Sequence, residues 1–142
     1  MTKGGDGTKA SPWRLATPSG GSGFAAYRDG TLCPAALVVV DGDTQVRYHL
    51  ACIAELYQML AAQGDWMALG EADEYEQAVA GSVEAWARSV DNPLGAWYGL
   101  TAGRRGFFGR YVPPVLEHMG LAEVEHNLSN NRMRAQLSPA SL

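Results

Sequence analysis

Alternating and continuous runs of apolar residues predict four β-strands in the first fifty positions. A Gly/Ser cluster at 19–23 separates the first two runs, which is typical of a turn. Asp41-Gly42 follows a β-branched run and strongly favours a hairpin. In the strand after this turn, Val46, Tyr48 and Leu50 alternate with polar residues, so one face is expected to be buried. The predicted strands cover residues 13–17, 24–28, 35–40 and 45–50.

Helical periodicity begins directly after the fourth strand. Apolar side chains recur at i, i+3, i+4 and i+7 from Ile53 to Leu60, which predicts a helix over 51–63 that ends at Gly64. A second helix is expected over 72–89, with Gly81 as a point at which it could be broken, because glycine lowers helix stability. Its apolar stripe comprises Tyr75, Ala78, Val79, Ser82, Val83 and Trp86, and Glu84 and Arg88 are expected to pair on its outer face.

The C-terminal part predicts a short helix and a second hairpin. Residues 113–119 fit a helix that ends at Gly120, with Leu116 and Leu121 as the hydrophobic pair of a Schellman motif. Strands are expected at 121–126 and 132–136, joined by a turn at 128–131. A four-residue loop places Asn127 opposite Arg132 and Glu125 opposite Arg134, the latter as a cross-strand ion pair.

The order of these elements determines the expected fold class. Strands, then helices, then strands follow one another without βαβ alternation. We therefore predict an α+β fold with an antiparallel sheet built from two hairpins and two main helices packed on one face. Residues 11–136 are expected to form a single domain, with flexible tails at 1–10 and 137–142.

Composition and charge argue against several classes of function. The chain has 142 residues, 46% of them apolar, and a net charge of −4. This acidity argues against nucleic acid or anionic lipid as a partner of the whole surface. Cys33 and Cys52 form no CxxC motif and are expected to be reduced thiols. No run approaches 18 apolar residues and the start lacks a secretory signal, so we expect no membrane association and a cytoplasmic location.

The segment 103–111 is the most unusual part of the chain because it interleaves arginine with glycine and aromatic residues. Such a loop can cradle a phosphate with backbone N–H groups and guanidinium groups. The favoured alternative is a structural turn, whose aromatic rings enter the core and whose arginines pair with the acidic segment 65–91. That segment holds seven acidic residues against Arg88 alone.

A glycine-rich aromatic segment at 92–100 precedes this loop and can wall a ligand pocket or fill the core. We predict a pocket for a small anionic or aromatic ligand at these segments and at the turn 126–132. No cofactor motif is present, and the spacing of the three histidines predicts no metal site. The candidate ligand-binding residues are Trp66, Trp97, Tyr98, Arg104, Arg105, Arg110, His126 and Arg132.

Cys52 is the one plausible nucleophile. It lies in the first turn of the predicted helix, where the helix dipole lowers the pKa of a thiol, and His49 precedes it as a candidate base. The favoured alternative is a small buried thiol on the apolar stripe.

Several short motifs resemble those of a small family of uncharacterised actinobacterial proteins, a domain of unknown function. The resemblance covers most of residues 12–135 and implies a free-standing domain, with no activity, cofactor or catalytic residue attached to it. The matching motifs are Pro12-Trp13, Gly64-Asp65-Trp66, Leu69-Gly70, Asp91-Asn92-Pro93, Trp97-Tyr98-Gly99-Leu100, Arg105-Gly106, Pro113-Pro114, Gly120 to Asn127 and Asn131 to Arg134.

Three functions are consistent with these features. The first is a small-molecule-binding protein, or a small enzyme of specialised metabolism, with an aromatic and arginine-lined pocket. The second is a homodimer or another protein-interaction module, because two hairpins leave sheet edges and the domain is rich in aromatic residues. The third is nucleic-acid binding through the C-terminal arginines, which the acidic net charge disfavours. The sequence leaves open whether the protein is an enzyme.

Overall fold

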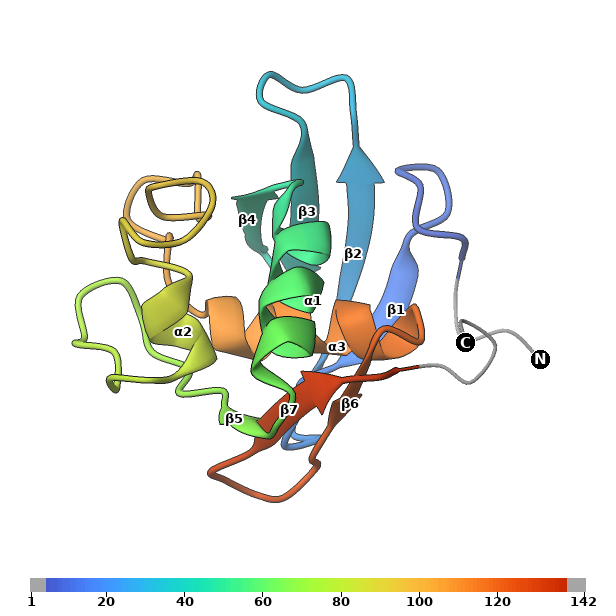
Figure 1. The fold of residues 1–142 in the computed structure, drawn as a ribbon. Coiled ribbons are helices and arrows are strands. Elements are labelled where there is room, and N and C mark those ends of the chain that lie inside the picture. Colours follow the sequence, from blue (N-terminus) through green and yellow to red (C-terminus); the bar gives the residue numbers. More distant parts are fainter. Residues whose placement is uncertain (1–4, 138–142) are drawn as a thin grey trace.

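A computed structural model describes residues 5–137 of the chain (Figure 1). The N-terminal half forms a four-stranded antiparallel sheet in the order β1-β2-β3-β4, so each strand pairs with its neighbour in sequence. The four predicted strands are confirmed to within one residue at every end. The strands are β1 (Trp13–Ala16), β2 (Gly23–Asp29), β3 (Ala36–Asp41) and β4 (Thr44–His49).

The hairpin between β3 and β4 sets the register of this sheet. Asp41 pairs with Thr44 across a two-residue turn in which Gly42 has φ 60°, a left-handed conformation that glycine adopts at no steric cost. The register places Val46 and Tyr48 on the buried face, as the alternation predicted, while Gln45 and Arg47 are exposed.

Two main helices cover that buried face. In Figure 1, α1 (Cys52–Gln63) lies in front of the sheet, and α3 (Phe108–His118) runs across the view behind α1, at the lower part of the sheet. α1 ends at Gly64 with φ 75°, as the sequence predicted. Leu56 and Leu60 of α1 and Leu116 of α3 are fully buried in one core with the inner face of the sheet. The predicted α+β class with two main helices on one face is therefore confirmed.

The C-terminal hairpin forms a separate sheet. β5 (Met67–Ala68), β6 (Ala122–Val124) and β7 (Arg132–Ala135) form a three-stranded antiparallel sheet in the order β5-β7-β6. The predicted register of this hairpin is wrong by two residues. Glu123 pairs with Arg134, and the Glu125 N–H donates to the carbonyl of Arg132. The connection is longer than four residues because the Asn131 side chain bonds both backbone groups of Asn127 and closes a wider turn.

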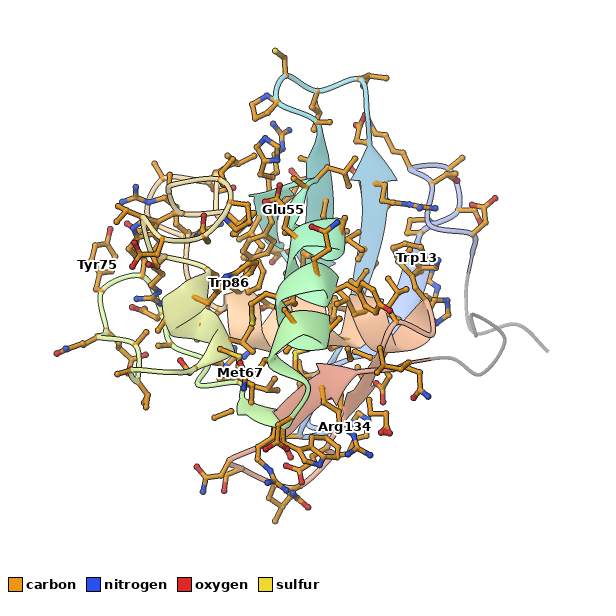
Figure 2. All side chains as sticks on the ribbon, in the orientation of Figure 1. Trp13, Glu55, Met67, Tyr75, Trp86 and Arg134 are labelled. Atoms are coloured by element: carbon orange, nitrogen blue, oxygen red, sulfur yellow. The ribbon has the colours of Figure 1, made fainter. Side chains whose placement is uncertain are left out.

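The long helix predicted over 72–89 is wrong. Only α2 (Val83–Trp86) is helical there, and residues 72–82 are irregular. Gly81 has φ 79°, which breaks a helix at that position. The predicted apolar stripe is also wrong in part, because Tyr75 is 80% exposed and Val79 is 66% exposed. Figure 2 shows Tyr75 pointing away from the molecule and Trp86 pointing inwards.

α3 begins five residues earlier than predicted, so that Pro113 and Pro114 lie inside it. Its end is as predicted. Gly120 has φ 76°, the Leu121 N–H donates to the Leu116 carbonyl over 2.8 Å, and the Gly120 N–H donates to Glu117 over 3.0 Å. These are the two hydrogen bonds of a Schellman motif, which confirms that prediction.

At the N-terminus, Gly7 contacts the sheet although the sequence assigns residues 1–10 to a tail. The Gly7 carbonyl accepts a hydrogen bond from the Arg28 N–H over 2.9 Å. The remaining tail residues, 1–4 and 138–142, lie outside the described part. Within 5–137, no helix is long and apolar enough to cross a membrane.

Two glycines allow the loop 99–107 to approach the rest of the core. Gly106 lies against the backbone of residues 72–74, and its carbonyl accepts a hydrogen bond from the Tyr48 hydroxyl over 2.7 Å. Gly99 lies against the backbone of Arg105 in the same way. A methyl group at either glycine would overlap backbone atoms, which cannot move as a flexible side chain can.

We therefore expect Gly106→Ala to lower the free energy of unfolding by about 1–3 kcal/mol, because an added methyl in a filled space forces the backbone apart. Gly30→Ala is the matched control, since nothing lies within 4 Å of the corresponding position and its φ is not left-handed. Urea denaturation followed by tryptophan fluorescence measures both. Equal stability of the two variants would contradict the close approach.

Candidate functional site

Two arginine side chains contact the Trp97 ring. The guanidinium carbon of Arg88 is 4.6 Å from the centre of the Trp97 ring, and that of Arg105 is 5.0 Å away. Arg105 also forms a bidentate ion pair with Glu74, with N–O distances of 3.0 and 3.2 Å. This pair lowers the pKa of Glu74 and raises that of Arg105. The ring and both cations thus have partners within the protein.

Tyr98, the next residue, lies in the core. It is fully buried and stacks on Trp86 with a centroid distance of 5.1 Å. Its hydroxyl donates a short hydrogen bond of 2.5 Å to the Glu55 carboxylate. Burial raises the pKa of Tyr98, and the neighbouring Glu55 raises it further. The side chain therefore stays protonated and joins the 92–100 segment to α1.

The other arginines of the loop differ in their surroundings. Arg110 pairs with Glu71 over 2.7 Å and lies 4.1 Å from the centre of the Phe107 ring. Arg104 is exposed, and its backbone N–H donates to Thr101. The alternative interpretation, in which arginines of this loop pair with the acidic segment, is confirmed for Arg105 and Arg110. The rings of Phe108 and Tyr111 enter the core, as that interpretation also expected.

Trp66 lies elsewhere, on the outer face of the small sheet. The guanidinium carbons of Arg132 and Arg134 are 5.2 and 4.5 Å from its ring centre. Arg132 pairs with Glu125 over 2.7 Å, and Arg134 pairs with Glu123 over 2.8 Å. Both arginines that contact the Trp66 ring are therefore neutralised by a glutamate. Figure 2 shows Arg134 near the lower edge of the small sheet.

His126 joins the start of the wide turn to two other segments. One ring nitrogen is 2.9 Å from the carbonyl oxygen of Pro18, and the other is 2.6 Å from the Glu117 carboxylate at the end of α3. Both neighbours accept hydrogen bonds, so both contacts need a ring N–H, which only the imidazolium form provides. The Glu117 contact accordingly raises the pKa of His126.

The predicted ligand-binding residues therefore fall into separate groups. Trp97, Tyr98 and Arg105 share one region, Trp66 and Arg132 share the outer face of the small sheet, and His126 binds the end of α3. Of the eight predicted residues, Arg132 alone lines either of the two hollows described below.

A buried carboxylate holds the irregular segment 72–82 against α3. Glu84 is fully buried, and its carboxylate accepts hydrogen bonds from three backbone N–H groups, those of Ala72 (3.2 Å), Phe108 (3.2 Å) and Gly109 (2.9 Å). The last two are first-turn donors of α3 that have no partner inside the helix. Burial raises the pKa of Glu84, and the Gly109 N–H and the Arg88 guanidinium oppose that rise.

Arg88 completes this network. Its guanidinium pairs with Glu84 over 3.2 Å and donates to the carbonyls of Ala72, Asp73 and Glu76, each over 2.7 Å. The predicted pair of Glu84 and Arg88 exists, but it is buried and not on an outer face. We name the contacts of Glu84 and Arg88 the Glu84 network.

Cys52 is confirmed as a buried thiol. It has no exposed surface, and burial raises its pKa, which disfavours the nucleophilic thiolate. The candidate base does not face it in a catalytic arrangement, since Nδ1 of His49 accepts a hydrogen bond from the Ala51 N–H. Among residues 5–137, no group of three His, Cys, Asp or Glu side chains is placed to hold a metal ion.

The larger of the two hollows, about 650 Å³, lies between the irregular segment and the wide turn of the C-terminal hairpin. We name it the hairpin groove. By its two sides we mean the two segments that line it. One comprises Ala68 to Ala72 with Glu76, Gln77 and Val79, the other comprises residues 128–132, and Ser19 lines it as well. A second hollow of about 540 Å³ lies beside β4, with Cys33, Arg47 and Thr101 among its lining residues.

The sequence reasoning missed the groove and the Glu84 network. Both depend on residues 72–82 being irregular, whereas their apolar spacing suggested a helix. Gly81 already marked a point at which the helix could break. Two further signals were Gly70 at the start of the segment and Glu84 among the apolar positions Val83 and Trp86. A carboxylate at such a position needs buried donors.

We expect Glu84→Gln to lower the free energy of unfolding by about 2–4 kcal/mol, because the neutral amide leaves Arg88 unpaired and places an NH₂ group among N–H donors. Glu123→Gln is the matched control, since it removes one carboxylate from a solvent-exposed ion pair. Urea denaturation compares the two. A loss for Glu84→Gln as small as that of the control would contradict a central role of the network.

The His126 contacts make stability depend on pH. A histidine whose pKa is raised on folding stabilises the fold below its ordinary pKa of 6.5, and this contribution is lost as pH rises through the folded pKa. His126→Gln should therefore lose more stability at about pH 5.5 than at about pH 8.5. NMR titration should show that Glu117→Gln lowers the pKa of His126, while Asp43→Asn, which removes a distant negative charge, has a smaller effect. A pH-independent loss for His126→Gln would contradict the assignment.

Comparison with known proteins gives the family of the chain but no function. Neither the curated proteins nor the solved structures contain a match to it. A family model described as a family of unknown function (DUF6855) matches residues 5–136, nearly the whole chain. The protein therefore belongs to this family of unknown function.

Proposed function

We propose that this domain is a binding module whose ligand lies in the hairpin groove. The observation that carries the proposal is the position of two exposed apolar side chains. Val79 is 66% exposed and Leu128 is 92% exposed, and both line the groove, one from each side. Large apolar side chains grouped around one concavity are typical of a binding surface.

The polar lining supports the same proposal. Asn131 is 8% exposed and holds the wide turn through both backbone groups of Asn127, so that side of the groove has a defined shape without a ligand. On the opposite side, the Glu84 network holds residues 72–76 through their backbone carbonyls. A preformed site of about 650 Å³ is within the usual range for ligand pockets, and rigid walls reduce the entropy lost on binding.

The predicted pocket at segment 92–111 has less support. Its arginines and Trp97 form ion pairs and cation–π contacts with one another, so a ligand there competes with existing partners. The same pairing weakens the nucleic-acid hypothesis, because Arg105, Arg110 and Arg132 are each neutralised by a glutamate. A homodimer stays a prediction, for which light scattering at micromolar concentration is the test.

The two cysteines support a reducing location such as the cytoplasm. Both are free, with Cys33 exposed in the loop before β3 and Cys52 buried in α1. An exposed free thiol is uncommon in oxidising compartments.

We expect a thermal-shift screen of the full chain with amino acids, short peptides, nucleotides and aromatic fragments to find ligands that raise the melting temperature by about 3 °C or more at saturation. The double variant Val79→Ser/Leu128→Ser should lose this response, because it removes the apolar contacts at both sides of the groove. Both side chains are exposed, so the variant should fold.

Val90→Ser is the matched control. Val90 is 78% exposed but does not line the groove. Its variant should respond to ligands as the unsubstituted protein does. The proposal is overturned if no ligand class shifts the melting temperature, or if the double variant and the control respond alike.

A further inference from the structure

Resting on the proposed function, we infer that the ligand of the hairpin groove is an extended, basic peptide segment of a partner protein, which adds as a strand to β5. The inference joins three features of the groove: an unpaired strand edge in it, an unneutralised carboxylate on one side, and apolar side chains on both sides. Peptide recognition by strand addition uses this combination, with main-chain hydrogen bonds for affinity and side-chain contacts for specificity.

The strand edge follows from the register of the small sheet. β5 is an edge strand, since the order is β5-β7-β6. The Leu69 N–H donates to the Asn131 carbonyl over 2.9 Å, so Leu69 and Asn131 form a hydrogen-bonded pair. In an antiparallel ladder, hydrogen-bonded pairs alternate with non-hydrogen-bonded pairs, in which the N–H and C=O groups point away from the partner strand. The neighbouring pair, Ala68 and Arg132, is therefore a non-hydrogen-bonded pair.

The N–H and C=O of Ala68 therefore point away from β7. Ala68 is exposed and lines the groove, and no hydrogen bond outside the ladder uses either group within residues 5–137. The edge is short, because the Leu69 carbonyl already accepts from the Glu84 N–H over 3.0 Å. An incoming strand consequently pairs with Ala68 through two hydrogen bonds and then continues along the groove.

The charges of the lining residues determine which peptide fits. Glu71 and Arg132 line the groove, but each is neutralised by a partner that does not, Arg110 and Glu125 respectively. Glu76 is exposed and accepts a hydrogen bond from the Asp73 N–H, and it has no cationic partner among the described residues. A lysine or arginine of the peptide supplies that missing charge.

The apolar side chains that line the groove favour a peptide in which apolar and basic residues alternate. Val79 of the irregular segment and Leu128 of the wide turn both line the groove. Successive side chains of a strand point to opposite faces, so a peptide that alternates apolar and basic residues directs one set to these side chains and the other to Glu76 and solvent.

The test is NMR titration of the full ¹⁵N-labelled chain with blocked peptides of alternating valine and lysine. We expect the largest shifts at the amides of Ala68, Gly70 and the turn 128–131. Methylating alternate peptide nitrogens on the edge that faces β5 should weaken binding about tenfold, because it removes the hydrogen bond to the Ala68 carbonyl and places a methyl group at the edge. Methylating the opposite edge of the peptide should leave binding unchanged.

Two further comparisons test the charge. A peptide of alternating valine and glutamate should bind at least tenfold more weakly than the lysine peptide. Glu76→Gln keeps the acceptor of the Asp73 N–H but removes the charge, and should weaken lysine-peptide binding about threefold. Asp43→Asn, in the exposed turn between β3 and β4, removes one charge outside the groove and should not.

The outcomes separate this inference from the proposed function. Strand addition is overturned, and groove binding kept, if peptides methylated on either edge bind equally or if only non-peptide fragments shift the groove amides. Shifts of the same amides that grow with protein concentration alone would identify a second copy of the chain as the occupant and overturn the peptide. If neither peptides nor fragments shift the groove amides, both proposals fail.

Discussion

The buried carboxylate of Glu84 is the constraint on which much of this structure depends. A fully buried carboxylate is costly unless its oxygens are bonded, and here two backbone donors at the start of α3, one at Ala72 and the Arg88 guanidinium bond them. One side chain thus replaces the missing N-terminal cap of α3, where Phe107 has φ 58° and makes no side-chain cap hydrogen bond. It also connects the two halves of the chain, because its donors lie 12 residues before it and 24 and 25 residues after it.

This connection explains why residues 72–82 do not form a helix. In a helix, the carbonyls of Ala72, Asp73 and Glu76 would accept from N–H groups four residues later. Here the Arg88 guanidinium donates a hydrogen bond to each of these three carbonyls. Charge-assisted hydrogen bonds are stronger than neutral ones, and this set is partly shielded from solvent. The segment is therefore fixed without being regular, and Val79 faces solvent and not the core.

Elements determined by local pattern could be predicted from the sequence. The turn at Gly42, the end of α1 at Gly64 and the Schellman motif at Gly120 each depend on a left-handed glycine next to a clear periodicity, and all three are as expected. Predictions that depend on a distant partner were less successful. The spacing from Tyr75 to Trp86 fits a helix, but the deciding partners of Glu84 lie at positions 108 and 109. No local pattern contains that contact. For Arg105 and Arg110, whose partners lie 31 and 39 residues away, the charge pattern predicted the acidic segment as partner but not the individual residues Glu74 and Glu71.

The two segments whose local structure differs from the prediction lie next to each other in the fold. The helix that does not form over 72–82 provides one side of the hairpin groove, and the turn that is wider than predicted provides the other. In each case a polar side chain, Arg88 or Asn131, bonds backbone groups that regular structure would otherwise pair. Using polar side chains to hold irregular backbone costs conformational entropy and regular hydrogen bonds, and it leaves Val79 and Leu128 exposed. Departures from local preference of this kind are concentrated at functional sites in proteins. Both departures meet at the groove, whereas the charges of the arginine-rich loop are already paired, and this favours the groove over that loop as the binding site.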